Sequence, residues 1–520
     1  MWFSFPDFLS PGQISVLCLL ACVFLTGKAI WRNYFSKLPP GPWGIPVIGA
    51  MFRLGKNPHI EFTKMAQQYG DVFSLMLGNR LVVVLNGLDA IQEALVKHST
   101  AFAGRPQLHT FKLGKRDGYG LVLGDYSPQW RLIRKISASA MQNFAKDKSN
   151  LEEKLLKECN RLVFCLKQQI GKPFDPLLTF KFATGNIILN ALFGVNLSYQ
   201  DEAIGRILHL SESFGKALKS NSHVDFFPFF TYLPNKSLSD FVSLMKESFD
   251  RVAEMFMKNK ESYTEGHVRN VADSFFNVLE KEMMKEKENG PVTENTPEIA
   301  PLLDDKQIIS AMTDLFGGAF DTSSTTLTWA LAYLIKYPDI QRQLQVELDH
   351  VVGRERLPIL EDLASLPLLQ ATVYELLRVT SLAPLSVPRS TTKETKIRDF
   401  VIPKDTMVLV NLWSVHRDPG IWKDPHVFNP WRFLNSAGEL IDPKSFGGFL
   451  PFSAGRRKCP GESLALRTIP VLLAALLHSF QFSQEGLSNV YQGINLEGNF
   501  GLTLTPETFY VRIEERKKTE

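Results

Sequence analysis

The chain has 520 residues, 44% of them hydrophobic and 22% charged, with a formal net charge of +4 at pH 7. This composition is ordinary for a globular protein, and the net charge is too small to indicate nucleic-acid binding. The five cysteines indicate no disulfide framework and fit a reducing compartment. The 38 phenylalanines, against 12 tyrosines and 8 tryptophans, favour a large apolar interior.

The first apolar segment covers residues 8–27, which carry no charge. Twenty helical residues span roughly 30 Å, the thickness of the hydrocarbon layer of a bilayer. A cleaved signal peptide is the alternative, but Asp7 precedes the segment and Lys28 and Arg32 follow it, the reverse of the usual order. We therefore predict an uncleaved membrane anchor within residues 1–36, with the rest of the chain on the cytosolic side.

After the anchor, residues 38–49 form a stiff segment rich in proline and glycine, suited to hold a globular body at a fixed angle to the membrane. Residues 72–77 and 80–86 have the composition of two short strands. Gly78 and Asn79 between them predict a hairpin.

Helical patterns dominate residues 128–280, and the polar stretch 281–296 predicts an exposed connection between helices. We find no internal repeat. The chain is therefore expected to be mainly α with small β-sheets, as one large domain over residues 37–520. The remaining predicted elements are helices at 306–336, 338–352 and 362–380, and short strands near 389–410.

One cysteine, Cys459, lies on a turn between Gly455 and Gly461, directly after the basic residues 456–458 and before an apolar helix at 464–480. The helix dipole and the positive charges are expected to lower the pKa of its thiol. Such a thiolate could be a nucleophile, a zinc ligand or an axial ligand of haem iron. Zinc needs further ligands at close spacing, and none is near in sequence. A nucleophile needs a histidine base, which could be distant, and a plain free cysteine is the remaining alternative.

The full pattern is Phe452-x-x-Gly455-x-Arg457-x-Cys459-x-Gly461. It resembles the haem-binding signature of the cytochrome P-450 family at all five fixed positions. The resemblance implies that haem b (iron-protoporphyrin IX) is the cofactor and that Cys459 is the axial ligand of its iron. Resemblance to the family extends over residues 37–512, with its motifs in the expected order, and the hinge after the anchor resembles microsomal members.

A second motif places Gly317 and Gly318 inside a predicted helix, where each glycine costs about 1 kcal/mol relative to alanine. Small residues allow a ligand to approach closely, although a kinked core helix with back-bonded hydroxyls is the alternative. The stretch resembles the distal helix of the family, in which Asp321 and Thr322 match the acid–threonine pair that delivers protons to oxygen. The family order Ala-Gly is reversed here, because Ala319 follows Gly318.

Glu375 and Arg378 are three residues apart, on one face of an apolar helix, so we predict a buried ion pair with further partners. Arg432 is a candidate partner. These residues match the Glu-x-x-Arg and Pro-x-Arg-Phe motifs of the family, which implies a structural role.

Trp130 and Arg134 are four residues apart, and both donors are expected to point the same way. In the family the matching residues hold a haem propionate, and Arg389 and Arg457 match further propionate donors. One face of a surface helix is the alternative.

The basic side chains of Arg131 and Lys135 would suit the docking of an acidic electron donor, although a solvated face explains them equally well. The resemblance implies that NADPH-cytochrome P-450 reductase supplies the electrons, with cytochrome b5 as a possible second donor. It also implies an endoplasmic reticulum membrane location.

Five aromatic residues gather within residues 223–234, which suits a core, a contact with the membrane surface, or a roof over a flat apolar ligand. This passage, 261–274 and 347–358 resemble the family-1 members that oxidise polycyclic aromatics and estrogens, and steroid hydroxylases have similar passages. The implied substrates, besides O₂, are flat aromatic or steroid-like molecules. By motif position the predicted pocket residues are Phe226, Phe320, Leu385, Val387 and Phe500.

The sequence therefore predicts a membrane-anchored haem-thiolate monooxygenase that does not bind nucleic acid. Two alternatives stay open at this point. One is a haem-thiolate isomerase or dehydratase that works without oxygen or a reductase, which the presence of both Asp321 and Thr322 disfavours. The other is a non-catalytic carrier of haem or of an apolar ligand.

Overall fold

The computed structural model describes residues 37–114, 120–196, 198–199, 222–289, 303–485 and 493–516, with five single positions between residues 12 and 27. Most of the predicted anchor, residues 8–27, therefore lies outside the described residues. Within the described part, α16 (Glu462–Ser479) is long and apolar enough to cross a bilayer, but 72% of it is buried inside the protein. We interpret α16 as a core helix.

The contacts within the chain divide it into two compact units, and the single large domain over residues 37–520 stays a prediction. Unit 1 comprises residues 1–106 and 388–411, and unit 2 comprises residues 107–387 and 412–520. The sequence does not reveal this division, because unit 1 is assembled from two segments that are far apart along the chain.

Unit 1 is built on a four-stranded sheet with the order β1-β2-β6-β3. The predicted hairpin is confirmed, because β1 and β2 are antiparallel and Leu77 pairs with Arg80 across Gly78 and Asn79. Gly78 has a φ of 56°, which suits a tight two-residue turn. The predicted strands near 389–410 are also present. The elements are α2 (Pro58–Tyr69), β1 (Val72–Leu77), β2 (Arg80–Leu85), α3 (Leu88–Gln92), β3 (Arg389–Ser390), β4 (Thr395–Ile397), β5 (Phe400–Ile402) and β6 (Met407–Val410).

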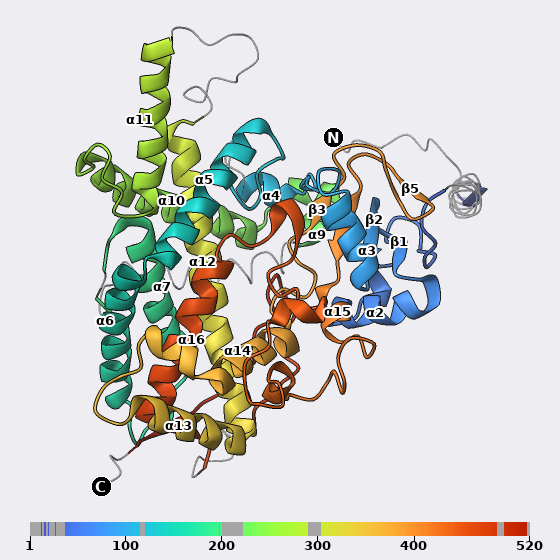
Figure 1. The fold of residues 1–520 in the computed structure, drawn as a ribbon. Helices are drawn as coiled ribbons and strands as arrows, with labels where there is room; N and C mark the ends of the chain where they lie inside the picture. Colours follow the sequence, from blue (N-terminus) through green and yellow to red (C-terminus); the bar gives the residue numbers. More distant parts are fainter. Residues whose placement is uncertain are drawn as a thin grey trace, which may run out of the picture. The chain divides into compact units, whose positions relative to one another are not determined.

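Unit 2 is mainly helical, and its core forms around α12, which packs against α7, α14 and α16 (Figure 1). The helices are α4 (His109–Gly114), α5 (Pro128–Lys146), α6 (Lys148–Lys167), α7 (Leu177–Phe193), α9 (Ser222–Phe226), α10 (Lys236–Glu261), α11 (Val271–Asn289), α12 (Asp305–Lys336), α13 (Pro338–Val352), α14 (Pro367–Thr380), α15 (Leu412–His416) and α16, with an antiparallel pair of strands β7 (Phe480–Ser483) and β8 (Arg512–Glu515).

The start of α12 follows from its sequence. Asp304 accepts a hydrogen bond from the Gln307 amide at 2.7 Å, and the Gln307 side chain accepts one from the Asp304 amide, which makes a capping box. The helix then continues through Gly317 and Gly318 to Lys336, close to the predicted bounds.

Two predicted boundaries are wrong. The first part of the polar stretch 281–296, which we expected to connect helices, continues α11 as far as Asn289, because glutamate, lysine and methionine are strong helix formers. The rest of that stretch lies outside the described residues. The helix predicted over 362–380 is interrupted at Leu366, which precedes Pro367 and has non-helical backbone angles, with φ −119° and ψ 62°. A short 3₁₀ turn, Glu361–Ser365, stands before α14 instead.

Candidate active site

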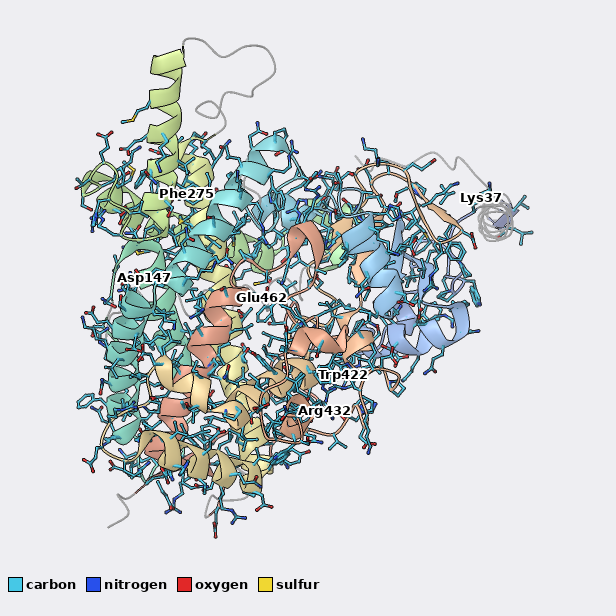
Figure 2. All side chains as sticks on the ribbon, in the orientation of Figure 1. Lys37, Asp147, Phe275, Trp422, Arg432 and Glu462 are labelled. Carbon is cyan, nitrogen blue, oxygen red and sulfur yellow. The ribbon has the colours of Figure 1, made fainter. Side chains whose placement is uncertain are left out.

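The loop that carries Cys459 is held by its own backbone. The Cys459 amide donates to the Phe452 carbonyl at 2.9 Å, and the Lys458 amide donates to the Gly455 carbonyl at 3.1 Å. Gly455 has a φ of 72°, a left-handed conformation that a side chain would strain. The loop ends at Gly461, where α16 begins at Glu462, a position labelled in Figure 2. These contacts present Cys459 just before the N-terminus of α16.

The electrostatics of the thiol differ from the prediction. Burial raises the pKa of the Cys459 thiol, and this effect outweighs the Gly461 and Glu462 amides and the Arg134 charge, which lower it. We expected a lowered pKa from the basic residues just upstream. Arg457 instead donates to backbone carbonyls, and Lys458 forms an ion pair with Glu462. The cation that favours the thiolate therefore comes from α5, not from the cysteine loop.

The donor set around Cys459 decides between the alternatives for this thiol. Among the described residues no group of three or more His, Cys, Asp or Glu side chains could hold a metal ion. A zinc ion at Cys459 would therefore lack the further protein ligands that it needs. Within the described part of the chain, no histidine is among the groups that shift the pKa of Cys459, which disfavours a nucleophile with a histidine base. A single thiolate does suffice for haem, because the porphyrin supplies the other four ligands.

The surroundings of the sulfur also fit haem. The Cys459 side chain is accessible although it lies deep among protein atoms. A Cβ on Gly461 would lie 3.8 Å from its sulfur, in van der Waals contact, so a side chain there would occupy space beside the thiol. Gly461 therefore leaves room for a flat group against the sulfur.

Trp130 and Arg134 do not aim their donors at one point. The Trp130 indole N–H donates to the Leu121 carbonyl at 2.9 Å, and the Arg134 guanidinium donates to the Lys458 carbonyl. The Arg457 guanidinium lies 4.0 Å from the centroid of the Trp130 ring. Loop carbonyls engage both donors, so propionate binding by these residues stays a prediction.

The loop at residues 120–124 joins these side chains, and the sequence analysis missed it. Its Gly124 carbonyl accepts from Arg457 at 2.7 Å, and its Val122 amide donates to Asp314 of α12 at 2.7 Å. Gly120 has a φ of 122°, which favours glycine. The loop thus connects α5, α12 and the cysteine loop through backbone atoms. Only the glycines at its two ends could have suggested it.

The other predicted propionate donor, Arg389, belongs to unit 1. It lies on β3, where it pairs with Val408 of β6, and it is 1% exposed. Its role toward haem stays a prediction.

The glycines of α12 leave free space beside the helix. Both Gly317 and Gly318 are exposed in a helix that is otherwise mostly buried, and a Cβ on either would meet no atom within 4 Å. The hydroxyl of Thr322 donates to the Gly318 carbonyl at 2.7 Å. The back-bonded hydroxyls of the alternative interpretation are therefore present, together with open space for a ligand.

Asp321 has a partner that the sequence analysis missed. The Lys181 ammonium of α7 lies 3.8 Å from the Asp321 carboxylate, and Lys181 is only 5% exposed. One turn later, the Thr184 hydroxyl donates to the Phe320 carbonyl at 3.0 Å. Lys181 is the single charged residue of α7, and this isolated charge was the available signal. A buried lysine needs a counter-charge, which Asp321 supplies.

Glu375, Arg378 and Arg432 form the predicted buried network. Glu375 and Arg378 are both 0% exposed and make two hydrogen bonds, at 2.7 and 2.8 Å. Glu375 also accepts from Arg432 at 3.0 Å and from the Asn429 amide at 2.9 Å. The Arg378 guanidinium lies 5.2 Å from the ring of Trp422, and Figure 2 labels Trp422 and Arg432 in this region. The network ties α14 to the segment before the cysteine loop.

The predicted pocket residues fall into two groups. Phe320 is buried, and its ring centroid lies 4.8 Å from that of Phe316, one turn earlier on α12. Phe500 packs against the same hydrophobic core. The remaining three are half-buried: Phe226 on α9, and Leu385 and Val387 after α14.

Comparison with known proteins agrees with this geometry. The model of the family described as cytochrome P450 matches residues 39–512. Cytochrome P450 1A1 of Rattus norvegicus is 35% identical over 517 residues, which cover 96% of this chain and 95% of the relative. Cytochrome P450 1A2 of Mus musculus is 36% identical over 512 residues, 96% of each chain. Cytochrome P450 1A1 of Homo sapiens is 36% identical over 456 residues, 86% of this chain and 87% of the relative. The chain therefore belongs to the cytochrome P450 family, is similar to its family-1 members, and is a monooxygenase with haem as its cofactor.

Proposed function

We propose that this chain inserts one oxygen atom from O₂ into flat apolar substrates, with Cys459 as the haem ligand and Asp321 and Thr322 as the proton-delivery pair. The observation that carries the proposal is the pair's position on α12, three and four residues after Gly318, with free space beside both glycines. Haem held through a thiolate supplies the oxygen chemistry, because thiolate donation favours O–O cleavage.

The residues of α12 have separate tasks in this proposal. The Thr322 hydroxyl donates its hydrogen to the Gly318 carbonyl. Its oxygen can therefore only accept a hydrogen bond from a donor that lies in the space beside the glycines. The Asp321 carboxylate is 29% exposed, so water can reach it, while the Lys181 ammonium lies 3.8 Å away on its buried side. Asp321 then exchanges protons with water, and Thr322 orients the last donor of the path.

Asp321→Asn and Thr322→Ala should keep the haem but lose efficient coupling of electron use to product. Proton transfer by a positioned group contributes at least about a hundredfold to rate, so we expect product per NADPH to fall about tenfold or more. The measurement is product formed against NADPH consumed, with haem content determined on the same sample.

Thr328→Ala is the matched control. Thr328 is buried on the same helix and donates to the Ser324 carbonyl at 2.9 Å, so its loss mimics the structural part of Thr322→Ala. If all three variants couple as the parent does, the proton-delivery assignment is wrong. Product formation without NADPH or O₂ would instead favour the isomerase or dehydratase, and bound haem without any product would favour a carrier.

The proposed substrates are flat aromatic or steroid-like molecules. Supporting this, Phe316 and Phe320 stack on α12 near the open glycine positions, and the aromatic residues Phe227 and Phe230 lie at 6.2 Å, edge to face, beside Phe226. Aromatic side chains favour flat apolar ligands. The resemblance of residues 223–234 to family-1 members points the same way.

A screen of flat aromatics and steroids against the purified holoprotein should find ligands that displace water and shift the haem spin state. Phe320→Ala should weaken the best ligand by about tenfold or more, since a buried aromatic contributes 1.4 kcal/mol or more to binding. Phe164→Ala, at an exposed position on α6, is the control. The substrate proposal fails if only small or polar compounds shift the spectrum.

The proposed setting is the endoplasmic reticulum membrane, with residues 8–27 as a single anchor. Electrons are proposed to come from NADPH through NADPH-cytochrome P-450 reductase, with cytochrome b5 as a possible second donor. Arg131 and Lys135 support a docking face, because both are exposed on α5, the helix that also carries Arg134.

A further inference from the structure

His416 is a buried histidine that none of the roles above uses. It is the last residue of α15 and is 0% exposed. Its carbonyl accepts a hydrogen bond from Arg378 at 2.7 Å, so it also borders the buried charge network.

Both ring nitrogens of His416 have partners, which determine the proton position. The Leu450 backbone amide donates to Nε2 at 3.1 Å. A backbone amide can only donate, so Nε2 is unprotonated and the proton lies on Nδ1. Nδ1 lies 2.7 Å from the Ser381 hydroxyl, which accepts this proton. Ser381 is the C-cap of α14 and has left-handed backbone angles.

A neutral imidazole is the form that the surroundings favour. Burial and the charges of Arg378 and Arg417 lower the pKa of His416 to about 3. The contacts of His416 therefore do not change across the physiological pH range.

Leu450 begins the chain segment that ends at Cys459. Its carbonyl accepts from the Ser453 amide at 3.0 Å, and the Phe452 carbonyl accepts from the Cys459 amide at 2.9 Å. Backbone hydrogen bonds thus connect Leu450, whose amide donates to His416, with Cys459. On the other side, Phe449 packs against Tyr374 and Phe433, with ring centroids at 5.7 and 5.6 Å.

We propose that His416 is a positioning residue for the haem ligand: through one fixed tautomer it fixes the start of the Cys459 loop to the end of α14. Apolar packing of Phe449 holds the loop against the protein interior but does not fix its exact position. The hydrogen bond from the Leu450 amide to the imidazole fixes that position, because a hydrogen bond is directional. The inference rests on Cys459 as the proposed ligand.

Two substitutions of His416 each remove one of its two ring hydrogen bonds, to Leu450 or to Ser381, and keep the other. His416→Gln places an amide oxygen at the position of Nε2, so it keeps the acceptor for the Leu450 amide and loses the bond to Ser381. His416→Asn places an amide nitrogen at the position of Nδ1, so it keeps the bond to Ser381 and loses the acceptor for Leu450. His478→Gln is the matched control, because His478 is also buried and its ring nitrogen lies 2.7 Å from the Gly353 carbonyl.

Two readouts on the haem-loaded protein test the proposal: hydrogen exchange of residues 449–453, and the share of the reduced carbon-monoxide complex with the thiolate-type red-shifted Soret band. In His416→Asn we expect exchange about fivefold faster, the effect of one lost hydrogen bond, and a smaller thiolate share. His416→Gln should restore both, and His478→Gln should change neither.

Equal behaviour of His416→Asn and His416→Gln, or parental values in His416→Asn, would overturn the proposal. Should His416→Asn not accumulate as folded protein, His416→Leu tests the same contact, because leucine fills the buried site without offering an acceptor to the Leu450 amide. It should also speed exchange and lower the thiolate share, and parental values would again count against us. A wrong ligand assignment is recognised separately, because Cys459→Ser would then keep the thiolate band.

Discussion

Cys459→Ser is expected to abolish the thiolate-type band and to lower product formation below detection. A serine hydroxyl is close in size but is a poor iron ligand, because its proton is lost far less readily than that of a thiol. The loop should survive, since the Cys459 amide bond to the Phe452 carbonyl is a backbone contact. The measurements are the reduced carbon-monoxide spectrum, haem per chain and turnover with NADPH and reductase.

Cys165→Ser provides the comparison. Cys165 is half-buried on α6, and burial raises the pKa of its thiol, as it does for Cys459. It therefore controls for the loss of a cysteine outside the proposed haem site. This variant should retain the spectrum and turnover of the parent. A thiolate-type band that persists in Cys459→Ser but disappears in Cys165→Ser would reassign the ligand.

Glu375→Gln is expected to have the largest effect on stability, a loss on the order of 3–5 kcal/mol in the free energy of unfolding. The substitution leaves Arg378 buried with its charge uncompensated, and it turns an amide toward two guanidinium groups that now donate to a carboxylate. The measurement is urea unfolding followed by circular dichroism, with haem retention determined in parallel.

Glu153→Gln is the control for charge loss alone. Glu153 pairs with Lys157 at 2.5 Å on the exposed surface of α6, where water screens the interaction, so its removal should leave the unfolding midpoint unchanged. If Glu375→Gln unfolds at the same urea concentration as this control, the buried network does not stabilise the fold as we argue.

The sequence predicted the local elements well, because local signals specify them. The helical pattern predicted α12 close to its observed bounds, and Gly78-Asn79 predicted the hairpin. The boundary at Leu366 was missed, although Pro367 was visible, because the helical pattern on either side was followed through it. We gave the apolar helical pattern more weight than the single proline, and therefore predicted one helix where the structure has a 3₁₀ turn followed by α14.

The parts of the site that depend on tertiary contacts could not be read from the sequence. The raised pKa of Cys459 depends on how many atoms surround the sulfur, which no motif records. Lys181 approaches Asp321 only because α7 packs along α12. The bonds that Trp130 and Arg457 make to the loop at 120–124 involve backbone carbonyls, which every residue type possesses. The motifs thus identified the side chains but not their partners.

The pairing of β2 with β6 has a consequence for how the chain is made. Val82 lies beside Met407 in a parallel register, and the first segment of unit 2, residues 107–387, intervenes between them. Until a ribosome has released β6, the nascent chain holds a β1–β2 hairpin with one bare edge, and such edges pair readily with foreign strands. The sheet can therefore be completed only late in synthesis, after residues 407–410 have left the ribosome, and the β2 edge is open to other strands until then.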